Sequence, residues 1–319
     1  MNSIILAGGY ATRLWPITKH RAKPLLPLGG KAILSYILNE LEEIDEMENI
    51  YITTNERFER SFKKYLEGRD SELYDLIIEE QTAEDEKLGA IGGIMNALDQ
   101  TETDDRLVIG GDNHYSFDII DFLDFAKRKD GIVNACYEVE SIEEAKNYGI
   151  LDFDENHKIQ DFQEKPEEPK SRMASTAFYY FPEDIEQIFD DYVEYWEGRI
   201  PRSRYLDEPG RFLAWTSKRY DCYAYPFTGT WADVGTRQGY LRAEDEIRDG
   251  NIIRGEVSDS GIGENVTILE NTKIENSEID NSIIFEGVTI KDSSIKDSIV
   301  GEDTKIQDLD LREGLVKNI

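Results

Sequence analysis

The order of apolar and polar residues over the first 245 positions alternates between two patterns. Short, continuous apolar runs at residues 3–7, 107–110 and 132–138 predict buried strands. Between such runs, apolar residues recur every three or four positions over residues 32–44 and 119–128, which predicts amphipathic helices. Alternation of this kind is typical of a parallel sheet with helices on both faces. The expected fold class is therefore α/β, with a Rossmann-like, mixed but mainly parallel sheet.

The same patterns predict further elements in this region. We expect strands at residues 50–53, 76–79 and 220–225, and helices at residues 58–66, 89–98, 184–195 and 238–248. Shorter strands at residues 149–153, 159–163 and 177–181 predict a β-rich insertion that walls one side of a pocket. Ligands of open α/β sheets bind at the carboxyl ends of the strands. The candidate site residues therefore belong to the turns that follow the strands.

Beyond Asn251 the pattern changes to one apolar residue every five or six positions. The repeating residues are Ile262, Ile268, Ile274, Ile279, Ile284, Ile290, Ile295, Val300, Ile306 and Leu311. This period is that of hexapeptide repeats, which form a parallel β-helix with three short strands in each turn. The length allows about three turns of six-residue repeats. We expect one domain over residues 1–245 and a linker with a short C-terminal parallel β-helix over residues 246–319.

Charge narrows the function classes. The 319 residues include 36 Lys and Arg against 67 Asp and Glu, for a net charge of −31. A nucleic-acid binder needs a basic face, and so does a protein that docks on anionic lipid. Neither partner is expected here. The acidic residues are spread along the chain and 39% of residues are hydrophobic, so we interpret the charge as the surface of a folded protein in a salt-rich, halophilic cytoplasm.

Cysteine content and targeting signals agree with a cytoplasmic location. The two cysteines, Cys136 and Cys222, lie in apolar, strand-like runs and are expected to be buried thiols. No apolar stretch approaches the ~18 residues of a membrane-spanning helix. The N-terminus lacks the basic region and the cleavage site of a signal peptide.

The turn after the first strand is the first candidate site. Leu6 leads into Gly8 and Gly9, and residues 10–18 follow with Ala11, Thr12 and Arg13. This is neither a Walker loop nor a dinucleotide fingerprint, because the further glycines of those motifs are absent. Glycines still let backbone N–H groups approach an anion, and an arginine adds a fork of donors. Lys23, ten residues on, is a second candidate cation for a phosphate.

Two aspartates follow other predicted strands. Asp112 comes after Gly110 and Gly111, and Asp233 lies in a glycine-flanked turn after Trp231. Carboxylates brought together in one cleft suit Mg²⁺, which prefers oxygen ligands and shares its coordination with substrate phosphates. The alternative is that each aspartate caps a turn or a helix.

These motifs together resemble the nucleotidyltransferases that make nucleotide sugars from sugar 1-phosphates. The opening pattern of that family, Gly-Gly-x-Gly-Thr-Arg-Leu followed by Pro-Lys-Pro-x-Leu-Pro, is similar to residues 8–14 and 22–27, except that Ala11 and Ala22 replace a Gly and a Pro. The resemblance continues, in family order, at residues 88–90, 111–113, 148–149, 164–166 and 231–236. It covers about residues 1–245, and the repeat tail resembles the left-handed β-helix of long family members.

The resemblance implies a role for each candidate residue. Arg13 and Lys23 would grip the triphosphate of a nucleoside triphosphate, with Leu6, Gly8, Gly9, Ala11, Thr12 and Gly89 in the nucleotide site. Tyr148, Gly149, Glu164, Lys165 and Tyr179 would bind the sugar phosphate, and Lys165 would be catalytic together with Arg13 and Lys23. Asp112 and Asp233 would hold Mg²⁺. No general base is required, and we interpret His114 as incidental.

Several alternatives remain open at this point. The substrates are expected to be glucose 1-phosphate with dTTP or UTP, with mannose 1-phosphate and GTP, or GlcNAc 1-phosphate and UTP, as alternatives. A non-catalytic subunit that binds a nucleotide sugar is the second function class, disfavoured because the five charged motif residues are all present. A tail with acyltransferase activity is disfavoured because no histidine follows His157. We expect a homo-oligomer, assembled through the C-terminal repeats.

Overall fold

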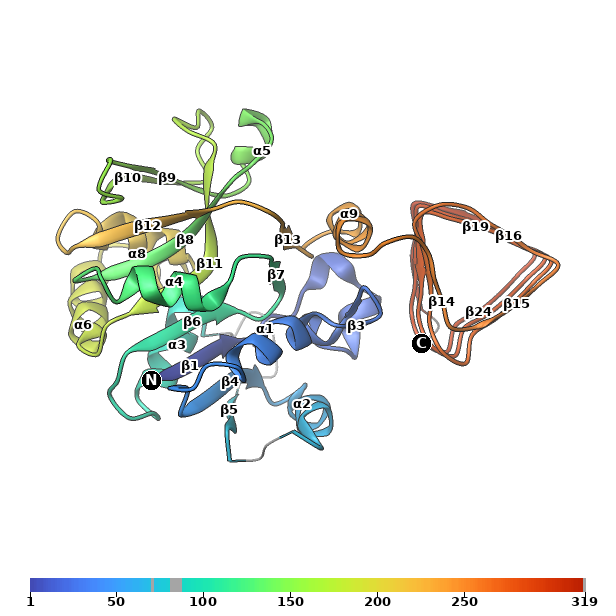
Figure 1. Ribbon diagram of the computed structural model, residues 1–319, viewed down its shortest axis with the longest axis horizontal. Helices are drawn as coiled ribbons and strands as arrows, with labels where there is room; N and C mark the ends of the chain where they lie inside the picture. The colour runs from blue at the N-terminus through green and yellow to red at the C-terminus, as the bar shows by residue number, and fades with distance from the viewer. Residues whose placement is uncertain (70–71, 81–87, 318–319) are drawn as a thin grey trace. The chain divides into compact units, whose positions relative to one another are not determined.

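The computed structural model describes residues 1–69, 72–80 and 88–317 (Figure 1). The chain forms two compact units. The first, the sheet unit, comprises Met1–Gly8, Ile37–Gly111 and Tyr115–Trp231. The second, the loop unit, comprises Gly9–Tyr36, Asp112–His114 and Ala232–Ile319. These units group residues by their contacts in space, so the domain boundary expected at residue 245 of the sequence stays a prediction.

A mixed, nine-stranded sheet forms the centre of the sheet unit. Its strands are β1 (Asn2–Leu6), β4 (Asn49–Asn55), β5 (Tyr74–Glu79), β6 (Arg106–Gly110), β8 (Ile132–Glu138), β9 (Gly149–Phe153), β10 (Ile159–Glu164), β11 (Met173–Phe181) and β12 (Cys222–Phe227). The main order is β10-β9-β11-β6-β1-β4-β5, and β8 joins β11 to β12. The strands β5, β4, β1 and β6 are parallel, whereas β11 is antiparallel to β6. The expected α/β fold with a parallel centre is confirmed.

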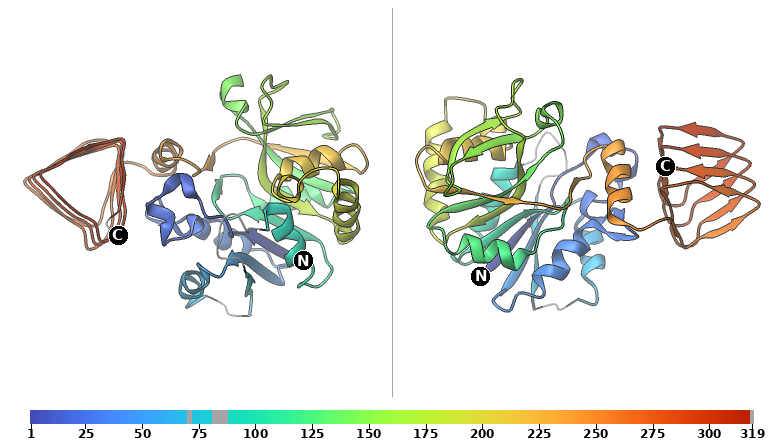
Figure 2. Two further views of the ribbon diagram at one scale, coloured as in Figure 1. Left: turned by 180° about the vertical axis from the view of Figure 1, so that it is seen from behind. Right: turned by 45° about the horizontal axis from the view of Figure 1, so that its top comes forward.

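Helices cover both faces of this sheet. They are α1 (Ile33–Leu41), which begins in the loop unit, α2 (Glu59–Leu66), α3 (Ala90–Leu98), α4 (Ile119–Ala126), α5 (Ile142–Ala145), α6 (Ile185–Trp196), α7 (Arg202–Tyr205) and α8 (Pro209–Thr216). Phe178 and Tyr179 are consecutive on β11, so their side chains point to opposite faces. Tyr179 belongs to a core with residues of α3, α6 and α8, whereas Phe178 packs against Phe122 of α4 at 4.9 Å between ring centroids. The view from behind shows the face that α3, α6 and α8 cover (Figure 2).

The loop unit begins with three short 3₁₀ turns, η1 (Thr12–Leu14), η2 (Ile17–Lys19) and η3 (Lys23–Leu25). The hairpin β2 (Pro27–Leu28) and β3 (Lys31–Ala32) follows, and α9 (Arg237–Ile247) precedes the repeats. A two-stranded sheet pairs β7 (Asn113–Tyr115) with β13 (Trp231–Asp233). It draws together segments that are more than 100 residues apart in sequence.

The repeats form a parallel β-helix of three sheets, whose stacked turns are visible in Figure 2. The first sheet contains β14 (Ile252–Ile253), β17 (Val266–Ile268), β20 (Ser282–Ile284), β23 (Ile299–Val300) and β26 (Leu315–Val316). The second contains β15 (Glu256–Ser258), β18 (Lys273–Glu275), β21 (Thr289–Lys291) and β24 (Lys305–Gln307). The third contains β16 (Gly261–Ile262), β19 (Glu278–Asp280), β22 (Ser294–Lys296) and β25 (Asp310–Arg312). This architecture is consistent with the expected left-handed β-helix.

The repeat period explains the composition of the tail. All ten repeating apolar residues predicted from the sequence pack in or against its interior. The turns hold residues with positive φ, among them Asn265, Asn281 and Asp297, because Asn and Asp tolerate this conformation best after glycine. The Asn281 amide donates to the Asp297 carboxylate one turn above. Paired positions such as Ile283 and Ile299 are 16 residues apart, so the turns are shorter than three hexapeptides and the chain completes about four rather than three.

The sequence pattern missed the helices near residue 205. We predicted no element between residues 196 and 219, where α7 and α8 form. Pro209 is the first residue of α8, a position that proline favours, so a local signal was present. Cys136 and Cys222 are buried free thiols, as predicted. None of the described helices is long and apolar enough to span a bilayer.

Candidate active site

Three of the predicted residues form one ionic cluster in the loop unit. The Lys23 ammonium lies 2.7 Å from Asp112 Oδ2 and 3.0 Å from Asp233 Oδ1. The lysine side chain is only 8% exposed, whereas those of Asp112 and Asp233 are 37% and 34% exposed. The sequence placed these three residues in one site, and the structure brings them into contact. We refer to them as the Lys23 cluster.

The local fold explains why these residues meet. Asp112 follows the end of β6, and the Gly111 amide donates to the Leu6 carbonyl at the end of β1. The sheet of β7 and β13 then brings Asp233 to the same place. Lys23 opens η3, with Pro24 fixing the first turn. The Asn113 amide donates to Asp112 Oδ1 at 2.8 Å, which orients this carboxylate.

The electrostatics of the Lys23 cluster favour a charged lysine. Burial disfavours the ammonium, but the charges and hydrogen bonds of Asp112 and Asp233 outweigh burial and raise the pKa of Lys23. The cluster carries one positive and two negative charges. Its carboxylates reach solvent, so they can still bind a cation or a substrate-bound metal.

The glycine turn supplies a second cation to the loop unit. Ala11 adopts a left-handed conformation, with φ 48° and ψ 45°, and immediately precedes η1. This is the position at which the resembled family has glycine, so Ala11 carries strain that glycine would not. Arg13 is exposed, and none of the described residues forms an ion pair with it. It is therefore available for an anion.

In the sheet unit, four of the five predicted sugar-phosphate residues, all but Tyr179, gather where β9 and β10 pair. Gly149 is the register partner of Glu164. A Cβ on Gly149 would lie 2.5 Å from Phe162 Cζ, so only glycine fits. Lys165 has φ 43°, its amide donates to the Tyr148 carbonyl, and its ammonium lies 4.0 Å from Glu164 Oε1. The Lys165 side chain is 66% exposed.

Helix α8, which the sequence missed, completes the surroundings of Glu164. A Cβ on Gly210 would lie 1.7 Å from Glu164 Oε2, so the backbone of α8 presses on this carboxylate. Burial raises the pKa of Glu164, and the charge on Lys165 reduces that effect in part. Tyr148 packs on Trp231 at 4.8 Å between ring centroids. Tyr179 lies in the core at 6% exposure, so its predicted ligand role would need its hydroxyl alone.

Gly8, a predicted nucleotide residue of the sheet unit, lies against a carboxylate to which the sequence analysis gave no role. Glu79 ends β5, is 8% exposed, and has a pKa raised by burial. A Cβ on Gly8 would lie 3.0 Å from its Oε1, and a Cβ on Gly93 would lie 3.1 Å from the same atom. Among the described residues, no side chain pairs with this carboxylate. The sequence signal for Glu79 was its place as the last residue of the strand predicted over residues 76–79.

Gly89 is fixed by its contact with residue 206. Its φ is 81°, and a Cβ would lie 2.5 Å from the Leu206 carbonyl oxygen. That carbonyl also accepts hydrogen bonds from the Ile91 and Gly92 amides at the start of α3. These two N–H groups of α3 are therefore not available to a ligand.

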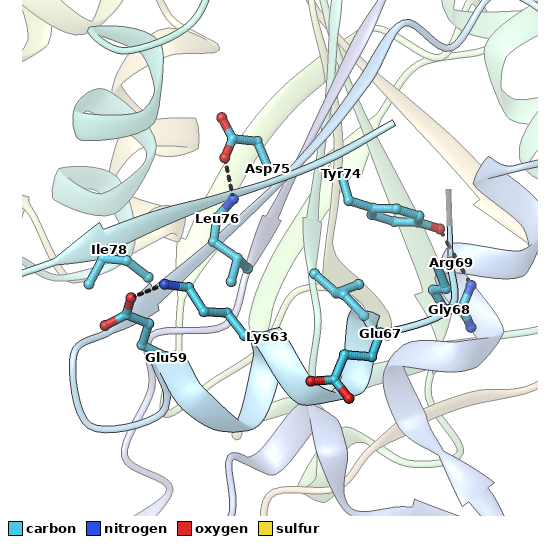
Figure 3. A pocket seen from close by; sticks show the side chains of 10 residues that line it. Glu59, Lys63, Glu67, Gly68, Arg69, Tyr74, Asp75, Leu76 and Ile78 are labelled. Carbon is cyan, nitrogen blue, oxygen red and sulfur yellow. Dashed lines mark hydrogen bonds and ion pairs between the residues drawn. The ribbon is translucent and has the colours of Figure 1, made fainter. Parts of the chain in front are cut away.

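Two further features carry no predicted site residue. His114 packs edge-on against Tyr36, and burial lowers its pKa to about 4. A groove of about 470 Å³ between α2 and β5 is lined by ten residues, and Figure 3 shows Lys63 beside Glu59 and Arg69 beside Tyr74. Lys63 contacts Glu59, and Arg69 contacts Tyr74. Among the described residues that line the groove, both cations are therefore engaged and neither is free for a phosphate.

Comparison with known proteins decides the family. Residues 2–250 match the family model described as nucleotidyl transferase. The chain belongs to the nucleotidyl transferase family. The resemblance found in the motifs is thereby confirmed over the region in which they occur.

The relatives of this nucleotidyl transferase have names that specify different nucleotides. A glucose-1-phosphate adenylyltransferase of Mycoplasma mobile is 30% identical over 331 positions, covering 86% of this chain and 84% of the relative. A Sulfolobus acidocaldarius protein assigned as a mannose-1-phosphate guanyltransferase is 26% identical, covering 88% and 76%. A Bacillus anthracis structure assigned as a glucose-1-phosphate thymidylyltransferase, in complex with sucrose, matches with a TM-score of 0.65 at 28% identity, covering 80% and 98%.

Proposed function

We propose that this protein is an enzyme that transfers a nucleotidyl group from a nucleoside triphosphate to a sugar 1-phosphate. The products are a nucleoside-diphosphate sugar and pyrophosphate. Its relatives support this class of activity. The single observation that carries the proposal is the Lys23 cluster, a buried ammonium between two solvent-reaching carboxylates, in the same unit as the exposed Arg13.

The step is an in-line displacement at phosphorus. An oxygen of the sugar phosphate forms a bond to the α-phosphorus, and the bond from that phosphorus to the bridging oxygen of the β-phosphate breaks. The electron pair leaves with pyrophosphate. The nucleophile is already ionised, so no protein group has to remove a proton. His114, whose pKa is lowered to about 4, is neutral and is not needed as a base.

The loop unit would bind the triphosphate. Arg13 would place its guanidinium on phosphate oxygens, and the amides of residues 9–12 would donate to others. Lys23, fixed by its two carboxylates, would hold a constant charge near the transferred group. Leu6, Gly8 and Gly89 of the sheet unit would border the base. Catalysis of this kind depends on positioning and charge neutralisation.

The sheet unit would bind the sugar phosphate. Lys165 would contact the phosphate, because its exposed ammonium is only loosely held at 4.0 Å from Glu164. Glu164 and the backbone of Gly149 would face the sugar hydroxyls, with Tyr148 and Tyr179 beside them. Burial of the Glu164 carboxylate strengthens hydrogen bonds that it accepts.

The residues of the Lys23 cluster fit Mg²⁺. Two aspartate carboxylates with solvent-reaching oxygens are a ligand set that Mg²⁺ uses when substrate phosphates supply further oxygens. Asp112 and Asp233 would hold the ion. When bound, it would neutralise charge on the phosphates. Within the described residues, no group of three or more His, Cys, Asp or Glu could hold a metal without substrate.

Pyrophosphate release from a panel of sugar phosphates and nucleoside triphosphates, with Mg²⁺, tests the proposal. We expect the highest rate with glucose 1-phosphate and dTTP or UTP. Mannose 1-phosphate with GTP is included because of the guanyltransferase relative, and GlcNAc 1-phosphate with UTP completes the panel. Binding of a nucleotide sugar with no turnover of any pair would support a non-catalytic subunit instead.

Asp112→Asn tests the assigned chemistry, with Asp124→Asn on the exposed face of α4 as a matched control. We expect the first to lower kcat by more than about tenfold, because metal sites supply several kcal/mol. The control should retain the wild-type rate. A smaller loss in Asp112→Asn would contradict the role given to this residue.

Charge and repeats support two further proposals. The net charge of −31 is suited to a salt-rich cytoplasm, where self-repulsion is screened. Unfolding followed against KCl concentration should show rising stability, and full stability in dilute buffer would contradict the proposal.

The β-helix exposes the side chains of Ile253 and Leu309 at 47% and 42%. This exposure supports assembly of a homo-oligomer through the repeats, and the mass of the full chain in solution tests it.

A further inference from the structure

The β-helix and the loop that carries Arg13 and Lys23 share one apolar core. Ile283, Phe285 and Ile299 of the β-helix belong to the same buried cluster as Leu14 and Ile17 of the loop. These residues lie in one compact unit. The repeats are therefore packed on the segment that carries Arg13 and Lys23.

An ion pair joins the same two segments. The Arg21 guanidinium makes a two-point contact with the Glu286 carboxylate, which lies in the turn between β20 and β21. The Arg21 Cζ also lies 5.4 Å from the centre of the Phe285 ring. Both side chains are partly shielded, at 23% and 37% exposure. Burial disfavours the Glu286 carboxylate, but Arg21 outweighs this and lowers the pKa of Glu286.

These contacts reach both ends of the loop that carries Arg13 and Lys23, which is proposed to bind the nucleotide. Arg21 is two residues before Lys23, and the intervening Ala22 is fully buried. On the other side, a Cβ on Gly301 would lie 3.1 Å from Ile17 Cδ1, so the β-helix abuts η2. The next residue, Thr18, is buried and its hydroxyl donates to the Ala11 carbonyl at 2.8 Å. Ala11 begins the turn that carries Arg13.

We propose that Glu286 is a positioning residue for nucleotide binding, which acts through Arg21 on the loop that holds Lys23 and Arg13. This inference rests on the proposed function. Glu286 touches none of the reacting groups. It holds Arg21 by two hydrogen bonds, and so restricts where η3 places the Lys23 ammonium relative to Asp112 and Asp233. The β-helix is then part of the nucleotide half of the site.

The inference makes a selective kinetic prediction, because the proposed sugar-phosphate residues belong to the other unit. In the full-length chain, Glu286→Gln should raise the KM for the nucleoside triphosphate by about tenfold, since small misplacement of binding groups has large effects. The KM for the sugar phosphate should stay within about twofold of wild type. Arg21→Gln should act alike, and the double variant should be no worse than either single variant, because both remove one contact.

Glu275→Gln is the matched control. It removes another ion pair of the β-helix, with Lys291 at 2.6 Å, on a different sheet of the helix. Both Michaelis constants should stay at their wild-type values in this variant. Arg21→Lys, which keeps the charge but loses the two-point contact, replaces Arg21→Gln if the latter does not fold. Circular dichroism and the unfolding temperature identify such a failure.

An unchanged nucleotide KM in Glu286→Gln and Arg21→Lys, together with a lowered unfolding temperature, would overturn the inference and leave the pair as a structural clamp. A different result would overturn the proposed function: no pyrophosphate from any substrate pair in the wild type. In that case, calorimetric titration of each variant with Mg²⁺ and dTTP or UTP still tests the inference. Weaker binding by Glu286→Gln than by Glu275→Gln supports it, and equal binding overturns it.

Discussion

Lys23 of the loop unit and Lys165 of the sheet unit, the two lysines proposed to bind phosphates, are held in opposite ways. Lys23 is buried and has two carboxylates within 3.0 Å, whereas Lys165 is 66% exposed and has one carboxylate at 4.0 Å. The first is positioned before any ligand arrives, because burial makes loss of its partners costly. The second keeps freedom that a ligand can remove. The comparison teaches that two lysines of equal charge need not contribute equally to stability and to binding.

Lys23→Met should break this comparison most strongly. It leaves two aspartates side by side without their cation, and we expect a loss of about 2–3 kcal/mol in the free energy of unfolding, less than for a fully buried pair because the carboxylates reach solvent. Activity should be lost as well. Chemical unfolding and pyrophosphate release measure the two effects. Wild-type stability would show that the cluster contributes little to the fold.

Lys165→Met should separate binding from stability. We expect the KM for the sugar phosphate to rise by about tenfold or more, equal to about 1.4 kcal/mol. The unfolding free energy should change by less than about 0.5 kcal/mol, as for other exposed side chains. Lys170→Met, an exposed lysine paired with Asp161, is the control and should leave the KM unchanged. A loss of stability without a change in KM would reverse the assignment.

Glu79→Gln extends the comparison to a buried carboxylate that has no side-chain partner among the described residues. Burial raises the pKa of Glu79 in the folded state. Its contribution to stability is therefore complete below the unfolded pKa and is lost as pH rises through the folded value. We expect the variant to exceed wild type by about 1 kcal/mol at neutral pH and by less near pH 4. If Glu79→Gln and wild type unfolded at equal temperatures at both pH values, burial of the Glu79 carboxylate would not destabilise the folded protein.

Ala11→Gly should have the smallest effect. Glycine removes the cost of the left-handed conformation at residue 11 but adds freedom to the unfolded chain, so we expect a net gain of about 0.5 kcal/mol. Gly9→Ala, at an open position with ordinary φ, is the opposite control. Denaturant midpoints measure both variants. A loss of stability in Ala11→Gly would mean that the alanine methyl group makes contacts worth more than its strain.

Much of the fold followed from local patterns. The strand runs and the helical spacing gave the central elements, because burial on one or two faces imposes the period of the element on the sequence. The repeat residues gave the β-helix interior for the same reason. The errors were local too. Helix α8 was missed although Pro209 marks its start. The six-residue repeat overestimated the length of a β-helix turn, which is 16 residues between Ile283 and Ile299. Because the apolar residues recur after either five or six positions, their average period does not fix the length of each of the three sides of a β-helix turn.

The sequence by itself determined which residue types stand after which strands, and therefore the candidates Lys23, Asp112 and Asp233. Only the tertiary structure decided that one ammonium lies between two carboxylates 89 and 210 residues away. It also decided that Glu286 holds Arg21, across 265 residues. Local patterns report burial and backbone geometry at each position. Pairing between distant side chains depends on the path of the whole chain, which no single segment specifies.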